Sequence, residues 1–344
     1  MTQLALTGWL APGLPDGLRQ SYERAAEHVR HPEASNTRRT YESKWAAWAK
    51  HCAALEHLDI VPLPIAPGHL VGYLQNLSDE GAAPNTVRLH LAALCALDAG
   101  HALSVGDKDR PPLRKTYVVQ RWLKGWSRLN PVAPRRRASA ITRPELVRVV
   151  ETAQEPGFNA CRAAHTVRYA RDRAMLAIGV AGALRISELI ALDLSDVTAS
   201  PVGLRIVVRR AKNDQSGEGQ VKVVLPQAKK IICPVEAFLE WQRARGAVPG
   251  PLFCAISRGG ELALGAGLSE RQGMRIVTDR CQAAGLVHVT SHSMRATFYT
   301  LSKGKPLSDV MAHAGSKSVK VALGYQRQGE LYDPEENPTA GLFG

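Results

Sequence analysis

A proline- and arginine-rich stretch most constrains the fold of this chain, because it separates two regions of different pattern. Residues 130–139 read Asn-Pro-Val-Ala-Pro-Arg-Arg-Arg-Ala-Ser and lack helical periodicity. Such a stretch is typical of a linker. The length of 344 residues also exceeds what a single hydrophobic core usually supports. The sequence therefore predicts two domains, at residues 1–130 and 142–344, joined by a linker at 131–141.

The first domain shows apolar residues at helical spacing in four segments. The first segment carries Tyr41, Trp45, Trp48 and Cys52, and the others are Leu70–Leu77, Val87–Cys95 and Val119–Trp126. Prolines separate the segments, at positions 62, 64, 67, 84, 111 and 112. This pattern predicts a small all-helical bundle, and we expect residues 1–13 to be disordered.

The second domain begins with a helix start signal. Thr142 and Glu145 have the spacing of a capping box, and Ser269 and Gln272 repeat it further on. Two segments rich in β-branched residues, Leu204–Arg209 and Gln220–Leu225, flank the polar segment Ala211–Gly219, which predicts a β-hairpin. The fold class that we expect is therefore mainly α with a small β-hairpin or sheet, α+β.

Composition indicates the kind of partner. The formal net charge is +13 and the pI is about 9.7, which favours nucleic acid. Six cysteines occur without a CxxC pair, and no Walker or dinucleotide motif is present. No run of about 18 apolar residues predicts a membrane span. We expect a cytoplasmic, nucleoid-associated protein without metal, cofactor or membrane partner.

Five widely spaced residues suggest phosphodiester chemistry. Cleavage without a metal requires fixed positive charge around the non-bridging oxygens, and guanidinium groups suit that role, which we assign to Arg185 and Arg295. His292 would accept a proton or contact the phosphate, and Lys212 would protonate the leaving 5′ oxygen as a general acid. Tyr325 would attack phosphorus and form a 3′-phosphotyrosine intermediate.

The same residues lie in motifs that resemble those of the tyrosine recombinase, or phage integrase, family. Gly182–Leu189 resembles the first arginine motif, His292-Ser293-Met294-Arg295 the His-x-x-Arg motif, and Lys212 the hairpin lysine. Ala314-Gly315-Ser316 followed by Tyr325 resembles the final motif and its tyrosine. The helix with Trp45 and Trp48 is similar to one in Cre, which places the chain near the Cre-like branch.

This resemblance implies a C-shaped clamp, formed by a helical core-binding domain and a catalytic domain with a C-terminal tail at 328–344. It implies site-specific recombination of double-stranded DNA at an inverted-repeat site, by a homodimer on one site and a homotetramer in the synapse. It also implies that Glu188 supports the lysine or histidine, and that the tail docks on a neighbouring protomer.

One position departs from the family pattern. Ser316, nine residues before Tyr325, stands where the family usually has histidine or tryptophan. Loss of one hydrogen bond to a charged group would cost about 1.5–3 kcal/mol, roughly ten- to a hundredfold in rate. His313 is an alternative donor for this position, although Gly315 predicts a turn that points it elsewhere.

Several arginines and lysines are candidate DNA contacts, with a merely solvated charged face as the alternative for each. In the first domain and linker they are Arg38, Arg39, Lys44, Arg88, Arg121, Arg135, Arg136 and Arg137. In the second domain, Leu268-Ser269-Glu270-Arg271 resembles the Cre-like helix that enters the major groove, which makes Arg271 the candidate for base readout.

Alternatives remain for two roles and for the function. Lys222, Arg209 and Arg210 compete with Lys212, while Tyr299 and Tyr332 compete with Tyr325. Tyr299 fits a buried core position, and acidic neighbours at Asp333–Glu336 disfavour Tyr332. The alternative functions are a DNA-binding or architectural protein that has lost strand exchange, and a type IB topoisomerase or hairpin resolvase.

Overall fold

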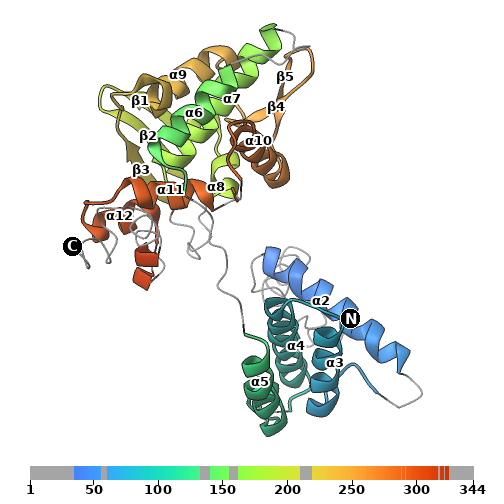
Figure 1. Ribbon diagram of the computed structural model, residues 1–344. Helices are drawn as coiled ribbons and strands as arrows, with labels where there is room; N and C mark the ends of the chain where they lie inside the picture. Colours follow the sequence, from blue (N-terminus) through green and yellow to red (C-terminus); the bar gives the residue numbers. More distant parts are fainter. Residues whose placement is uncertain are drawn as a thin grey trace, which may run out of the picture. The chain divides into compact units, whose positions relative to one another are not determined.

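The computed structural model describes residues 35–55, 60–107, 109–131, 140–154, 162–209, 219–287, 289–290, 292–316, 318–320 and 322–324. The chain divides into two compact units, Met1–Arg135 and Arg136–Gly344. Both are mainly helical, and the second also contains two small antiparallel sheets (Figure 1). The expected α+β class is therefore confirmed.

The first unit is a helical bundle, as its periodicity predicts. Its helices are α2 (Ser35–Ala54), α3 (Pro67–Asp79), α4 (Pro84–Ser104) and α5 (Tyr117–Leu129), with the 3-10 turn η2 (Leu113–Lys115) before α5. Proline lies in the first turn of α3 and of α4, where its missing N–H is not needed. The apolar stripes meet in one core around Trp48, Leu74 and Trp126.

A buried ion pair fixes the loop that precedes α3. Asp98 on α4 is 1% exposed, and its Oδ1 accepts hydrogen bonds from the Ile65 backbone N–H at 2.9 Å and from Arg110 Nη2 at 2.9 Å. Arg110 also donates to the Ile65 carbonyl at 2.8 Å. The two charged residues therefore hold an apolar loop residue against the bundle through its backbone groups.

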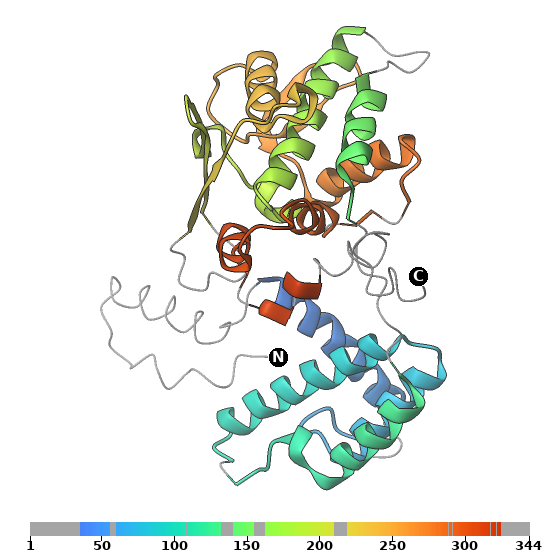
Figure 2. The same ribbon diagram turned by 60° about the vertical axis from the view of Figure 1, so that its left-hand side comes forward.

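The second unit packs its helices around α7. Its helices are α6 (Arg143–Gln154), α7 (Arg162–Ala181), α8 (Ile186–Ile190), α9 (Pro234–Arg245), α10 (Glu270–Ala283), α11 (Ser293–Leu301) and α12 (Leu307–Ala314). The expected capping boxes are confirmed, because Glu145 accepts from the Thr142 N–H at 2.8 Å and Ser269 caps α10. Figure 2 shows the larger sheet beside α7 with α11 and α12 toward one end.

The larger sheet contains the predicted hairpin. Its order is β1 (Val197–Ser200), β2 (Gly203–Val208) and β3 (Gln220–Val224), all antiparallel, and Ile206 pairs with Lys222. A Cβ on Gly203, whose φ is +149°, would lie 2.3 Å from the Val224 carbonyl oxygen. Only glycine therefore allows β2 to begin this close to the end of β3. A second sheet of β4 (Cys254–Ile256) and β5 (Leu262–Gly267) was not expected.

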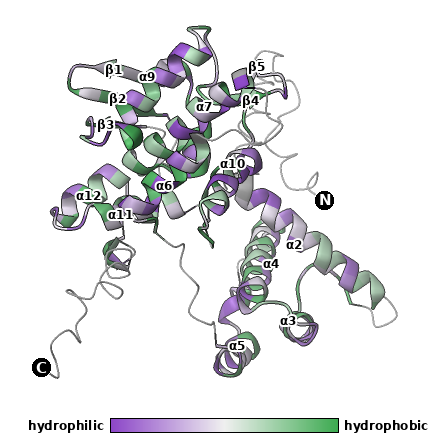
Figure 3. Ribbon diagram, turned by 45° about the horizontal axis from the view of Figure 1, so that its top comes forward, coloured by the Kyte–Doolittle hydropathy of each residue, from purple (hydrophilic) through white to green (hydrophobic). Residues whose placement is uncertain are grey.

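Two hydrophobic cores support the second unit. The larger one lies among α6, α7, α9, α10 and the sheet, and includes Trp241 and Phe253. A smaller one joins Ala183, Tyr299, Val310, Ala314 and Ala322 at the end of α7. Figure 3 shows both hydrophilic and hydrophobic residues along α10, which buries Gly273, Val277 and Cys281. Ala183 of the smaller core and Leu184 of the larger core directly precede Arg185.

Candidate functional site

Arg185 is placed by the turn that ends α7. The Gly182 N–H donates to the Ile178 carbonyl at 2.8 Å and the Leu184 N–H to the Gly179 carbonyl at 2.9 Å. Between them Ala183 is fully buried with a φ of +48°, a left-handed conformation that is uncommon for a residue with a Cβ. The chain thereby reverses, and Arg185 becomes the N-cap residue of α8.

Glu188 on α8 is the carboxylate of the site. It is 5% exposed, and its Oε2 accepts the Arg185 backbone N–H at 2.9 Å. Its Oε1 accepts from Arg185 Nη1 at 2.5 Å, and its Oε2 lies 4.0 Å from Arg295 Nη1. One buried carboxylate therefore pairs with both arginines. Its expected support of the lysine or histidine stays a prediction.

Arg295 projects into the same region from α11, whose N-cap residue is the exposed His292. Its guanidinium is buried, with Nη2 donating to the Ala314 carbonyl. Its Nη1 has no hydrogen-bond partner among the described residues. Burial and the nearby Arg185 lower the pKa of Arg295 from its ordinary value, while Glu188 and the Tyr299 hydroxyl oppose that shift. A buried donor of this kind suits an anion that enters the site.

Lys222 on β3 adds a third cation. It is 3% exposed, and its Nζ donates to the His313 carbonyl at 2.5 Å. Burial lowers the pKa of Lys222 from 10.5 to about 8, with Arg295 and Arg185 acting in the same direction and Glu188 opposing them. Lys222 was only an alternative to Lys212 in the sequence, where its burial could not be seen.

The C-terminal end of α12 brings these groups together. Its last three carbonyls, those of Ala312, His313 and Ala314, accept hydrogen bonds from Gln220, Lys222 and Arg295 respectively. Positive groups are favourable at a helix C-terminus, because the carbonyls there lack partners within the helix. We call this arrangement the α12 clasp. The helix then ends at Gly315, with a left-handed φ of +63°.

Ser316 follows this turn and is half-buried, with its N–H donating to the Met311 carbonyl at 3.0 Å. His313 faces elsewhere, as Gly315 predicted. Its Nε2 lies 2.9 Å from the Ala181 carbonyl oxygen, and its ring stacks on Phe298 with centroids 4.9 Å apart. Burial lowers the pKa of His313. In this conformation His313 joins α12 to the end of α7 instead of replacing the usual donor at position 316.

Other candidates are placed as follows. Tyr299 is fully buried in the smaller core, and Arg209 pairs with Asp196 at 2.7 Å and Asp193 at 3.0 Å. Several candidates lie outside the described residues: Tyr325, Lys212, Arg210, Tyr332, Arg135, Arg136, Arg137 and the tail at 328–344. Their roles stay predictions from sequence.

Candidate DNA contacts of the first unit lie on several helices. Arg39 and Arg121 are exposed, Lys44 is half-buried and Arg38 lies 3.7 Å from Glu42. Arg88 is held over the Trp126 ring at 5.3 Å. Sequence periodicity missed a further basic surface along η2 and α5, a hollow lined in part by Arg114, Lys115, Lys124 and Arg128. Its only signal was the density of basic residues between positions 114 and 128.

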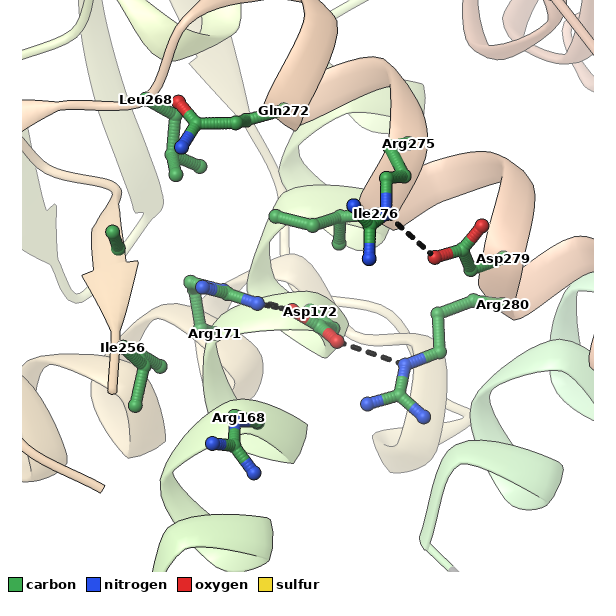
Figure 4. Close-up of a pocket in the computed structure, with 11 residues that line it drawn as sticks. Arg168, Arg171, Asp172, Ile256, Leu268, Gln272, Arg275, Ile276, Asp279 and Arg280 are labelled. Atoms are coloured by element: carbon green, nitrogen blue, oxygen red, sulfur yellow. Dashed lines mark hydrogen bonds and ion pairs between the residues drawn. The ribbon is translucent and has the colours of Figure 1, made fainter. Parts of the chain in front are cut away.

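Arg271 is exposed in the first turn of α10, and the same helix lines a hollow of about 460 Å³ beside α7 and β4. Figure 4 shows Asp172 between Arg171 and Arg280, 2.8 Å from each. Arg275 lies 3.4 Å from Asp279 in the same hollow. Of these ion pairs, Arg280–Asp172 ties α10 to α7, and none of their members belongs to the cluster around Arg295.

The described part of the chain contains no group of three or more His, Cys, Asp or Glu side chains placed to hold a metal ion. Its cysteines at positions 52, 95, 233, 254 and 281 are free thiols. None of its helices has the length and apolar character needed to cross a membrane.

The chain is similar to known integrases and recombinases. The model of the phage integrase family matches residues 145–329. The integrase/recombinase xerD homolog of Selenomonas ruminantium is 26% identical over 314 residues, which cover 90% of this chain and 86% of the relative.

Two solved structures are similar in fold. A lambda integrase dimer bound to a COC′ core site has a TM-score of 0.58 at 15% identity, covering 90% of this chain and 77% of that one. A lambda integrase tetramer bound to a Holliday junction has a TM-score of 0.54 at 16% identity, covering 87% and 76%.

Proposed function

The chain belongs to the phage integrase family, and on that premise we propose that it is a tyrosine-type site-specific DNA recombinase. The observation that carries this proposal is the pair of arginines, Arg185 and Arg295, oriented by the buried Glu188. Arg295 keeps a buried Nη1 without a hydrogen-bond partner among the described residues, as a phosphate-binding group requires.

In the proposed reaction, the two guanidinium groups hold the non-bridging oxygens of one phosphodiester. The Tyr325 oxygen attacks phosphorus and gives up its proton to His292. A P–O bond to tyrosine forms, while the bond to the 5′ oxygen breaks and Lys212 protonates that oxygen. The 3′-phosphotyrosine keeps the bond energy, so a 5′ hydroxyl of another strand can reverse the step without a nucleotide cofactor.

We propose that the DNA site has inverted repeats, with a dimer on each site and a tetramer joining two sites. The lambda integrase dimer on its core site and the tetramer on a Holliday junction support this arrangement by fold. Both units would bind the duplex in the cytoplasm. Arg271 on α10 would read bases, while the basic surface along η2 and α5 would contact phosphates.

Selection of bound DNA from a random pool supplies the substrate for the test. The expected product contains inverted repeats around a short spacer. A nicked duplex of that sequence should trap a covalent adduct with the wild-type protein and none with Tyr325→Phe. A wild-type protein that binds the duplex but forms no adduct would instead be an architectural protein, a result that Ser316 makes worth testing.

A second assay separates recombination from simple strand passage. Plasmids that carry paired copies of the selected site should exchange partners when the protein is added. Relaxation of supercoils without exchange would indicate a type IB topoisomerase and contradict the proposal.

A further inference from the structure

Lys222 occupies a strand position that normally holds an apolar side chain. Its neighbours Val221 and Val223 are 54% and 52% exposed, while Lys222 is 3% exposed and Val224 is also buried. The strand therefore turns two valines outward and a lysine inward. Burial of an ammonium group is unfavourable unless it is paired, and lysine is rarely buried without a partner. The residues around Lys222 must therefore explain why it is buried.

The surroundings supply too few acceptors. An ammonium group has three N–H donors, and only the His313 carbonyl accepts from it among the described residues. The charged and titratable groups that act on it are Arg185 and Glu188 at the start of α8, Arg295 on α11 and His313 on α12. The donors that remain are thus available to a ligand.

The charge of this cluster indicates what the ligand is. Lys222, Arg185 and Arg295 are cations, and among the described residues Glu188 is the only acidic group that acts on Lys222, so positive charge there is in excess by two. A phosphodiester carries one negative charge, and its oxygens gain more as a nucleophile adds to phosphorus. The two excess positive charges therefore exceed the single negative charge of a bound phosphodiester. They stabilise the more negative transition state better than the ground state.

We propose that Lys222 is a second lysine of the cleavage site, whose ammonium binds a non-bridging oxygen of the scissile phosphate. This inference rests on the proposed function, and it assigns different roles to Lys212 and Lys222. Lys212 on the hairpin protonates the leaving oxygen, whereas Lys222 on β3 stabilises charge and transfers no proton. The α12 clasp holds Lys222 in place through the His313 carbonyl.

The role has a pH signature. In the free protein the pKa of Lys222 is lowered to about 8, so the ammonium is lost as pH rises above that value. A bound phosphate favours the charged form, and binding above pH 8 therefore takes up a proton. Wild-type cleavage at limiting protein concentration should fall above pH 8, while Lys222→Arg stays charged and should not show this fall.

Modified substrates separate the two lysines. The selected duplex is prepared with an ordinary phosphate, with a methylphosphonate that removes the charge of one non-bridging oxygen, and with a 5′-bridging sulfur whose thiolate leaves without a proton. Lys222→Met should cleave the ordinary duplex on the order of a hundredfold more slowly than wild type. The difference in cleavage rate between Lys222→Met and wild type should disappear on the methylphosphonate and persist on the sulfur substrate. The difference between Lys212→Met and wild type should persist on the methylphosphonate and disappear on the sulfur substrate.

Val223→Met is the matched control, because it places the same side chain next to Lys222 on β3, at a position that is 52% exposed and faces outward. It should retain cleavage within severalfold of wild type. The proposal fails if Val223→Met matches the loss in Lys222→Met, or if the difference between Lys222→Met and wild type survives on the methylphosphonate or disappears on the sulfur substrate.

Should Lys222→Met not fold, the pH profile of Lys222→Arg decides, and an unchanged alkaline fall contradicts the proposal. An absent adduct in wild type would instead refute the proposed function itself.

Discussion

Replacing Glu188 with glutamine removes the one acidic group that acts on Lys222 within the described part of the chain, while keeping a side chain of the same shape. Glu188 is 5% exposed and compensates Arg185 at 2.5 Å, Arg295 at 4.0 Å and the more distant Lys222. The glutamine oxygen can still accept the Arg185 backbone N–H. The change therefore tests the charge of the carboxylate more than its packing.

The expected loss of stability is large. Two unit charges at 4 Å interact by about 4 kcal/mol at an effective dielectric constant near 20. Removing one partner of a buried ion pair typically costs about 3–5 kcal/mol. In a unit of this size each kcal/mol lowers Tm by about 2–4 °C, which predicts a fall of roughly 6–20 °C.

Thermal unfolding with and without sulfate checks this reasoning. Because Glu188→Gln leaves the cations uncompensated, sulfate should raise its Tm by more than it raises that of wild type. Asp279→Asn is the control, since Asp279 is 59% exposed and lies 3.4 Å from Arg275 in the same unit. Exposed pairs contribute about 0–1 kcal/mol, so Tm should hardly change. A Glu188→Gln Tm within about 1 °C of wild type, with no added response to sulfate, would refute this account.

Four further predictions concern single side chains. Burial lowers the pKa of His90 from 6.5 to about 4, so the unfolded chain takes up a proton that the folded chain does not. Stability of the first unit should fall by about 3 kcal/mol as pH drops from 6.5 to 4, measured by urea unfolding, and His90→Gln should lose this slope. Asp98→Ala should cost about 3–5 kcal/mol in the same assay, because it leaves Arg110 without its carboxylate. Ser316→His should speed adduct formation roughly ten- to a hundredfold, and an unchanged rate would show that the position needs no ring. His313→Ala should act through stability, lowering Tm by several degrees, since the ring binds Ala181 and Phe298.

Local patterns in the sequence predicted much of this fold. The helices of the first unit follow from apolar spacing and prolines, and β2 and β3 follow from β-branched runs around a polar segment. The strands that were missed lack that signal. β1 buries only Val197, and β5 contains Gly265 and Gly267, residues that weaken the signal of a strand.

The arrangement of the site depends on contacts that no local pattern reveals. The family resemblance implied that Glu188 supports the lysine or histidine, whereas its ion pair with Arg185, three residues earlier, was seen only in the structure. The bond from Lys222 to His313 spans 91 residues, and that from His313 to Ala181 spans 132. Polarity alone also gives the wrong side-chain orientation on β3, where Val221 and Val223 face outward and Lys222 faces inward. A shift of one residue in strand register reverses every side chain, so this placement required the structure.

The α12 clasp explains how the site can hold buried cations before DNA arrives. Three neutral helix carbonyls accept from Gln220, Lys222 and Arg295, so the cations are oriented without being neutralised. A second carboxylate could orient them equally well, but it would lower the positive excess that is available to a phosphate from two to one. The same bonds fix the backbone just before Ser316, where the family usually relies on a ring. Because that backbone is held by three side chains, from β3 and α11, Ser316 can start from a defined position even though its side chain is small.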